Sequence, residues 1–174
     1  ILFLSRIVPE KGLRRLIQAF GRVKTGKRLV IAGGSSDTDA FLEELKGMAE
    51  GDDRLLFTGF VEGRVKHELY SNAYVYVLPS DLEGMPLSLL EAMCYGNCCL
   101  VSDIAECAEV VEDRAMTFRR GEDGDLARKL QLLCDSPELV EHYRREACAF
   151  ICAKYSWEET LKRTLEVYNG HEAR

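Results

Sequence analysis

Two carboxylates, Glu83 and Glu91, stand eight residues apart around the start of a short apolar pattern. Glu83 precedes a flexible glycine, whereas Glu91 interrupts a run in which Leu87, Leu90 and Met93 recur at helical spacing. An acid in such a run either faces solvent or contacts a ligand, and the pattern alone leaves both interpretations open. Two carboxylates can act as an acid/base pair, or they can accept hydrogen bonds from the hydroxyl groups of one ligand.

Groups that could bind an anion follow the predicted strands. Arg6 and Lys11 come after the first apolar run, and Gly33-Gly34 comes after the second. Arg6 would present a planar fork and Lys11 a point charge, while the glycine amides could approach a ligand closely. Residues 79–86 lead into a predicted helix start, which bears free amides and about half a positive charge. Each feature alone is also compatible with a simple turn or a solvated charge, but together they predict an anion site, with phosphate as the natural ligand.

Strand and helix patterns alternate along the whole chain. Short apolar runs predict strands at residues 1–5, 28–32, 54–58, 74–78, 98–101 and 116–118. Helical periodicity and start signals predict helices at residues 11–24, 39–50, 62–72, 86–95, 106–111, 123–134, 137–154 and 157–168. This alternation predicts an α/β fold with a parallel sheet covered on both faces. In such folds ligands bind at the carboxyl ends of the strands, where the loops described above lie.

Length and charge narrow the class of protein. The 174 residues are enough for one domain with a substantial core, and no apolar run approaches the roughly 20 residues of a membrane-spanning helix. A net charge of −6 argues against a general nucleic-acid binder. Eight of the 23 Lys and Arg residues lie within residues 1–28, which hold one acid, Glu10. This basic segment is compatible with an anionic ligand, an anionic membrane surface or a solvated helix face. The chain opens inside a strand pattern without Met, so we expect a fragment or an excised domain.

Seven cysteines are present, an odd number without any C-x-x-C spacing. Four of them lie in or near an apolar strand, where we expect small buried thiols: Cys94, Cys98, Cys99 and Cys107. Cys148 and Cys152 are four residues apart on one face of a predicted helix. The histidines are not near them in sequence, so we expect no zinc site and a reduced, cytoplasmic protein.

Several motifs together resemble the retaining glycosyltransferases of family 4. The stretch 79–86 followed by Glu91-Ala92-Met93 and Gly96 is similar to that family's signature, including its Glu-x7-Glu motif. Residues 5–12, Ser-Arg-Ile-x-Pro-Glu-Lys-Gly, resemble its basic phosphate loop, and residues 58–61, Thr-Gly-Phe-Val, its base-side loop. Ser102-Asp103 and residues 109–111 follow in the expected order. The resemblance implies a Rossmann-like domain over residues 1–174, the carboxyl-terminal, donor-binding half of a GT-B fold, whose amino-terminal acceptor domain is missing.

The resemblance also implies roles for individual residues. Arg6 and Lys11 would hold the donor diphosphate and stabilise the leaving group, and Glu83 would contact the sugar. Glu91 would accept hydrogen bonds from the two ribose hydroxyls. The remaining expected nucleotide contacts are Gly33, Gly34, Phe60, Val61, Gly84, Met85, Pro86 and Leu87. The helix-start amides would support the diphosphate without a metal, so the resemblance implies no cofactor beyond a UDP-, GDP- or ADP-sugar donor.

The implied activity is transfer of a hexosyl group to a glycan, lipid-linked or small-molecule acceptor, with the full-length enzyme cytoplasmic and peripheral to the cytoplasmic membrane face. Three alternatives remain at the level of sequence. The first is a non-catalytic nucleotide-sugar-binding or regulatory module on the same fold. The second is another GT-B-like enzyme, such as a sugar phosphorylase or a nucleotide-sugar epimerase. The third is a simple nucleotide- or dinucleotide-dependent Rossmann enzyme, which the absence of a G-x-G-x-x-G fingerprint disfavours.

Overall fold

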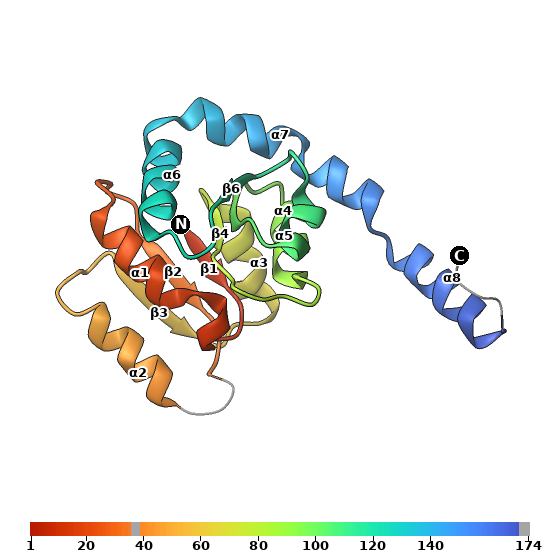
Figure 1. Ribbon diagram of the computed structural model, residues 1–174, viewed down its shortest axis with the longest axis horizontal. Helices are drawn as coiled ribbons and strands as arrows, with labels where there is room; N and C mark the ends of the chain where they lie inside the picture. Colours follow the sequence, from red (N-terminus) through yellow and green to blue (C-terminus); the bar gives the residue numbers. More distant parts are fainter. Residues whose placement is uncertain (36–38, 171–174) are drawn as a thin grey trace.

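The computed structural model describes residues 1–35 and 39–170, which form a six-stranded parallel sheet (Figure 1). The strand order is β3-β2-β1-β4-β5-β6, the order of a doubly wound dinucleotide-binding sheet. The strands are β1 Leu2–Leu4, β2 Leu29–Ala32, β3 Leu55–Gly59, β4 Tyr76–Leu78, β5 Cys99–Ser102 and β6 Met116–Phe118. The predicted α/β fold is therefore confirmed. The chain runs outward from β1 in one direction and then from β4 in the other, so the loops after β1 and β4 diverge at the point where ligands bind in such sheets.

Helices cover both faces of the sheet. They are α1 Leu13–Arg22, α2 Asp39–Met48, α3 Gly63–Asn72, α4 Leu87–Cys94, α5 Ala105–Val111, α6 Asp123–Asp135, α7 Pro137–Lys154 and α8 Trp157–Tyr168. In Figure 1, α1, α2 and α6 lie to the left of the sheet, and α3, α4 and α5 lie to its right. The right-handed crossovers of a doubly wound sheet produce this division. Helix α1 packs against α2 and α6, and α7 packs against α4.

The predicted helix over residues 11–24 begins later than expected. Residues Pro9–Lys11 form a short 3-10 helix, η1, and Gly12 then adopts a left-handed conformation with φ of 69°. A Cβ at Gly12 would lie 1.9 Å from the carbonyl oxygen of Pro79, so this position requires glycine. The close approach of two distant loops therefore interrupts the periodic pattern, and α1 starts at Leu13. The other predicted elements agree with the structure to within two residues.

The core fills both sides of the four central strands, and its largest fully buried side chains include Phe3, Phe20, Tyr70 and Tyr76. Edge strand β3 is only partly buried. The expected burial of Cys98, Cys99 and Cys107 is confirmed, but Cys94 is exposed. It is the last residue of α4, where the helix surface meets α7 instead of the sheet. The prediction for Cys94 was wrong because nearness to an apolar strand in sequence does not fix the face of a helix end.

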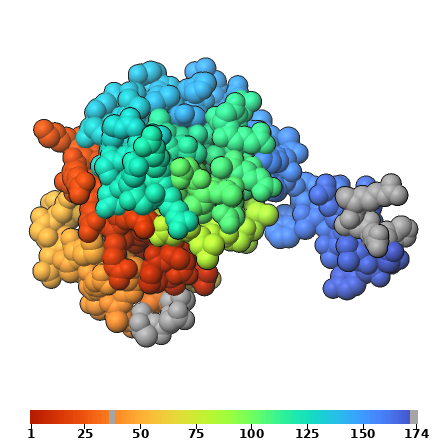
Figure 2. All heavy atoms as spheres, viewed as in Figure 1, coloured from red at the N-terminus to blue at the C-terminus, as the bar shows by residue number. Residues whose placement is uncertain are grey.

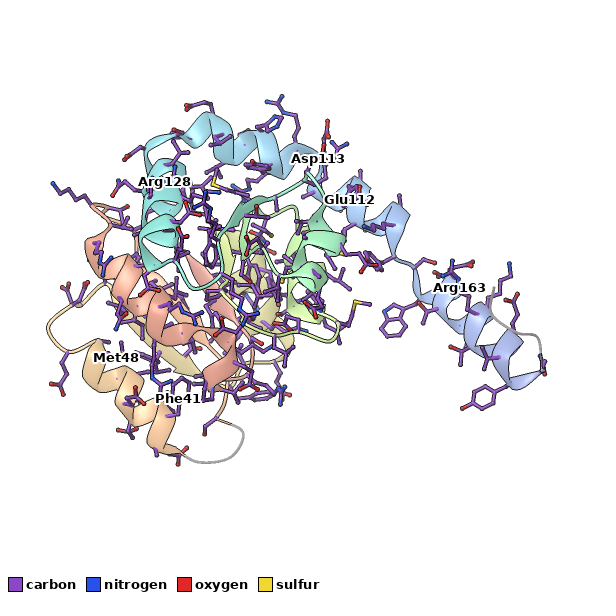
Figure 3. The ribbon with its side chains drawn as sticks, viewed as in Figure 1. Phe41, Met48, Glu112, Asp113, Arg128 and Arg163 are labelled. Atoms are coloured by element: carbon purple, nitrogen blue, oxygen red, sulfur yellow. The ribbon has the colours of Figure 1, made fainter. Side chains whose placement is uncertain are left out.

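Helix α8 stands apart from the rest of the molecule and forms a separate lobe in Figure 2. Ser156 caps it, since its side chain accepts a hydrogen bond from the Glu159 amide. Large apolar side chains of α8 are exposed, with Trp157 at 80% and Tyr168 at 84% of their full accessibility. Arg163, labelled in Figure 3, also lies on this lobe, away from the sheet. Within the described residues, no helix is both long enough and apolar enough to cross a membrane.

Candidate functional site

A cavity of about 330 Å³ opens at the carboxyl ends of β1, β2 and β3. The loops after these strands and the helices α3 and α4 all contribute to its wall. Its lining residues are Leu4, Ser5, Arg6, Gly33, Gly34, Phe60, Val61, Glu62, Gly63, Lys66 and Glu91. This is the edge at which the sheet topology predicts a ligand. One cavity wall therefore combines two cations, two carboxylates, glycine backbone and an aromatic ring. The ring belongs to Phe60, which is 74% exposed.

Backbone packing requires a glycine at position 33 of the cavity wall. Gly33 has φ of 152°, and a Cβ there would lie 1.9 Å from the carbonyl oxygen of Ser5. The loops after β1 and β2 stay paired beyond the sheet, since the Ser5 amide donates to Ala32 O (3.1 Å) and the Ile7 amide donates to Gly34 O (2.9 Å). The backbone at this wall is therefore bare and fixed in position, which permits a ligand to approach it closely.

Glu91 is held from the neighbouring helix α3 by two donors. Lys66 Nζ donates to Glu91 Oε1 at 2.8 Å, and the Tyr70 hydroxyl donates to Glu91 Oε2 at 2.9 Å. Burial, and then the neighbouring Tyr76 and Glu91, raise the pKa of Tyr70, so its hydroxyl keeps the proton that it donates. Each carboxylate oxygen can accept more than one hydrogen bond, so both oxygens retain capacity for a ligand. Glu91 is half-buried and lines the cavity, so its side chain does not simply face bulk solvent.

Tyr76 joins the first turn of α4 to the end of β1. Its buried hydroxyl donates to the carbonyl oxygen of Leu4 (3.2 Å) and pairs with Ser88 Oγ (2.8 Å). Burial raises the pKa of Tyr76 well above its usual value, so the phenol stays neutral. The amino-terminal end of α4 is thereby fixed beside a residue that lines the cavity.

Lys11 and Glu83 form a buried ion pair between the loops after β1 and β4. Lys11 Nζ lies 2.6 Å from Glu83 Oε1, and the two residues are 7% and 8% exposed. Ser80 Oγ donates to the same carboxylate oxygen at 2.7 Å, and Ser102 Oγ in turn donates to Ser80 O at 2.5 Å. Within the described residues, no hydrogen bond reaches Glu83 Oε2. The ammonium of Lys11 likewise has two further N–H donors beyond the one that Glu83 uses.

These two loops are also joined through their backbones. The Asp81 amide donates to Glu10 O at 2.8 Å, one residue before Lys11. Gly12 approaches the carbonyl oxygen of Pro79 so closely that no Cβ fits between them. Three independent contacts therefore hold the loop after β1, which carries Lys11, against the loop after β4, which carries Glu83.

The structure brings together half of the site residues that the sequence predicted. Those that line the cavity are Arg6, Gly33, Gly34, Phe60, Val61 and Glu91. Those that lie outside its lining are Lys11, Glu83, Gly84, Met85, Pro86 and Leu87. In this second group Lys11 and Glu83 are paired, Pro86 is buried, and the other three are exposed around the start of α4.

The partners of the two carboxylates, Glu83 and Glu91, could not be read from the motifs alone. Lys66 and Tyr70 lie four residues apart on α3 and meet Glu91 on one face of that helix. This i, i+4 spacing was the available signal. Ser80 lies within the quoted motif, but only the folded loop shows that it donates to Glu83.

A larger hollow, of about 600 Å³, lies between Asp81, in the loop after β4, and the outer side of α1. Its arginines are engaged, because Arg14 pairs with Glu44 and Arg15 pairs with Asp81 at 2.6 Å. It therefore offers less for an anionic ligand than the cavity at the strand ends. Among residues 1–35 and 39–170, no group of three or more His, Cys, Asp or Glu side chains is arranged to hold a metal ion.

The chain is similar in sequence to one family of known proteins. The profile of the family described as "Glycosyl transferases group 1" matches residues 1–150. An uncharacterised glycosyltransferase of Methanocaldococcus jannaschii is 30% identical over 173 residues, covering 97% of this chain and 44% of that protein. Alpha-maltose-1-phosphate synthase of Mycobacterium tuberculosis is 27% identical over 180 residues, covering 96% of this chain and 46% of the enzyme.

Solved structures agree on the fold. HepE of Anabaena, in complex with UDP and glucose, superposes with a TM-score of 0.89 at 18% identity, covering 97% of this chain and 47% of that one. Sucrose-phosphate synthase of Thermosynechococcus elongatus gives a TM-score of 0.86 at 23% identity, covering 97% of this chain and 44% of that one. The chain thus spans about half the length of the relatives that it matches.

Proposed function

The chain belongs to the glycosyl transferases group 1, and from this premise we propose that it is the carboxyl-terminal, donor-binding half of a retaining glycosyltransferase. The proposed reaction moves a hexosyl group from a nucleotide-diphosphate sugar to a glycan, lipid-linked or small-molecule acceptor. The observation that carries the proposal is the wall shared by Arg6, Gly33, Gly34 and Glu91 at the switch point of the sheet. It combines groups suited to phosphate and to ribose in one cavity.

In this proposal the nucleoside occupies the cavity. Glu91 accepts hydrogen bonds from the two ribose hydroxyls with the lone pairs that Lys66 and Tyr70 leave free. Phe60 and Val61 lie on the opposite loop, where the exposed ring could cover the base. Gly33 and Gly34 leave room for the ligand because no side chain projects from that wall.

The diphosphate extends from the cavity toward the start of α4. Arg6 is exposed at the cavity wall, and no hydrogen bond or ion pair within the described residues engages its guanidinium. Lys11 contributes its two remaining N–H donors, and the helix-start amides near Met85 to Leu87 add to them. When the glycosidic bond breaks, negative charge grows on the nucleoside diphosphate, so fixed positive groups stabilise the transition state more than the ground state. No metal enters this scheme.

Glu83 positions the sugar in this proposal. Its Oε1 is occupied by Lys11 and Ser80, and its Oε2 remains to accept a sugar hydroxyl. A carboxylate anchored through one oxygen is better suited to orient a ring than to move in as a nucleophile. We therefore propose front-face attack, in which the leaving phosphate helps to deprotonate the acceptor, instead of the double displacement of retaining glycosidases.

Relatives support a nucleotide-sugar donor and a second domain. HepE was solved with UDP and glucose. The chain corresponds to about half of that protein, so the proposal includes an amino-terminal domain in cis that binds the acceptor. The exposed apolar side chains of α8 support a further packing partner in the whole protein.

Calorimetric titration of the chain with UDP, GDP and ADP tests the proposal. We expect weak but measurable binding of at least one of them, and no sugar transfer by this chain alone. Pyrophosphate serves as the control, because a site that reads only phosphate would bind it as well as the nucleotide. A folded sample that binds none of the three nucleotides would refute the donor site. In the full-length protein, Arg6→Ala should reduce turnover, and an unchanged rate would refute the role of Arg6 in stabilising the leaving group.

A further inference from the structure

Three thiols gather where α4 packs against α7, outside the cavity. Cys94 ends α4, and Cys148 and Cys152 lie on successive turns of α7. Cys94 Sγ and Cys152 Sγ are 3.8 Å apart, although the residues are 58 positions apart in sequence. All three side chains are exposed, so a small molecule can reach them.

The helix that carries Cys152 is held at its middle and at its end. Arg144 Nε donates to Gly96 O at 3.4 Å, which ties the middle of α7 to the turn after α4. Lys154 Nζ donates to Glu112 Oε1 at 2.7 Å, at the end of α5, where Figure 3 places Glu112 beside α7. Between these contacts Ala147 and Ile151 are buried against the core. The thiols therefore sit at the rim of a fixed packing surface, and the contact between Cys94 and Cys152 is part of the fold.

We propose that Cys94 and Cys152 form a reversible disulfide and so constitute a redox modification site whose oxidant is a low-molecular-weight disulfide. Closing the pair requires the sulfur–sulfur distance to shorten from 3.8 Å to about 2.05 Å. Rotation of two exposed side chains, with a small shift of the helices, can supply that change. Cys148 remains a thiol in this arrangement, because Cys152 is the α7 thiol in contact with α4.

The reaction is a two-step thiol–disulfide exchange. In the first step the Cys152 thiolate attacks the small disulfide, forms a mixed disulfide and releases one small thiolate. In the second step Cys94 loses its proton and attacks the Cys152 sulfur, which forms the internal bond and releases the second small thiolate. Two protein thiols are oxidised and one small disulfide is reduced to two thiols, so electrons and atoms balance.

The order of attack follows from the surroundings of Cys94. Partial burial, and then the neighbouring Cys152 thiol, raise the pKa of Cys94 to about 11. At neutral pH Cys94 is therefore almost entirely a thiol, which makes it a poor first nucleophile. It acts after the mixed disulfide has formed, when its proximity to the Cys152 sulfur compensates for its small thiolate fraction.

The bond would join α4, which carries Glu91 one turn before Cys94, to α7. The inference does not depend on the proposed function, since its test counts thiols and requires no nucleotide.

The test uses the reduced chain, an excess of oxidised glutathione and alkylation of accessible thiols before denaturation. We expect an intact mass lower by two hydrogen atoms, two fewer alkylated thiols and a Cys94–Cys152 link in tandem mass spectra. Cys148→Ser is the matched control and should form the same link. Cys94→Ser and Cys152→Ser should not form it, and circular dichroism verifies that each variant is folded.

Several outcomes would overturn the proposal. They are a Cys148–Cys152 link in place of the one expected, a mixed disulfide with glutathione that persists at Cys94 or Cys152 in the chain without substitutions, a link between two chains, and an unchanged number of accessible thiols. A link to Cys98, Cys99 or Cys107, which are buried, would indicate unfolding and would equally contradict a native site.

Discussion

Replacing Glu91 with glutamine keeps the size of the side chain and removes its negative charge. In the folded chain this carboxylate accepts from Lys66 at 2.8 Å and from Tyr70 at 2.9 Å and also lines the cavity. If it holds the ribose of a nucleotide, Glu91→Gln should weaken binding. If it merely contributes charge to the cavity, the same change should strengthen binding, because the ligand is a polyanion and Lys66 would lose its partner.

The two effects differ in size as well as in sign. A hydrogen bond to a charged group contributes about 1.5–3 kcal/mol, and its loss corresponds to a dissociation constant about 10- to 150-fold higher. In water, removing one negative charge at roughly 8 Å gains about 0.5 kcal/mol for each phosphate charge, or about 1–1.5 kcal/mol over a nucleoside diphosphate, whereas two ribose hydrogen bonds would be lost. The loss of the ribose contact should therefore dominate, and the affinity should fall.

Calorimetric titration of the tightest-binding nucleotide against both forms of the chain measures this difference. Glu62→Gln is the matched control, since Glu62 also lines the cavity and makes no side-chain cap with α3. It should bind nucleotide with unchanged or slightly higher affinity. Equal or tighter binding by the Glu91→Gln variant would refute the ribose contact.

Three further predictions concern the loops and the buried thiols. Gly33→Ala should abolish nucleotide binding and lower Tm, because its Cβ would lie 1.9 Å from a carbonyl oxygen; Gly34→Ala, whose Cβ would lie 3.6 Å from the nearest side chain, should preserve both in the same melts and titrations. Lys11→Met should lower the free energy of unfolding by about 3–5 kcal/mol because Glu83 stays buried and unpaired, and adding Glu83→Gln should restore part of it, so equal losses in the single and double variants would contradict the argument. Burial raises the pKa of the Cys98 and Cys107 thiols to about 12. Above about pH 8.5 the unfolded chain releases protons that the folded chain keeps, so the free energy of unfolding should fall with rising pH, by up to about 1.4 kcal/mol per pH unit for each thiol. Urea titrations in reducing agent that give equal stability at pH 8.5 and pH 10 would contradict this.

The elements could be predicted from the sequence because their signals are local. Helix α7 begins at a proline, α8 begins after a serine cap, and both have the predicted bounds, 137–154 and 157–168. The failure at Lys11 had a cause that is not local. Residues 11–24 form one amphipathic pattern in the sequence, but the close approach of the Pro79 carbonyl group keeps Gly12 in a left-handed conformation, outside the helix.

The site could be predicted only as a set of loops. Sheet topology places Arg6, Gly33 and Glu91 at one edge, and all three line one cavity in the structure. Which side chains pair there depends on distances between residues far apart in sequence, as with Lys11 and Glu83, 72 positions apart. The contact between Cys94 and Cys152 was hidden for the same reason.

The fixed contact between the loops that carry Lys11 and Glu83 has a consequence for engineering. Exchanging one of these loops for that of a relative, in order to change the donor sugar, would separate Gly12 from the Pro79 carbonyl that it accommodates and the Glu10 carbonyl from the Asp81 amide. The two loops are therefore one transferable unit despite their distance in sequence. A graft that moves both together should fold, whereas either loop alone should not.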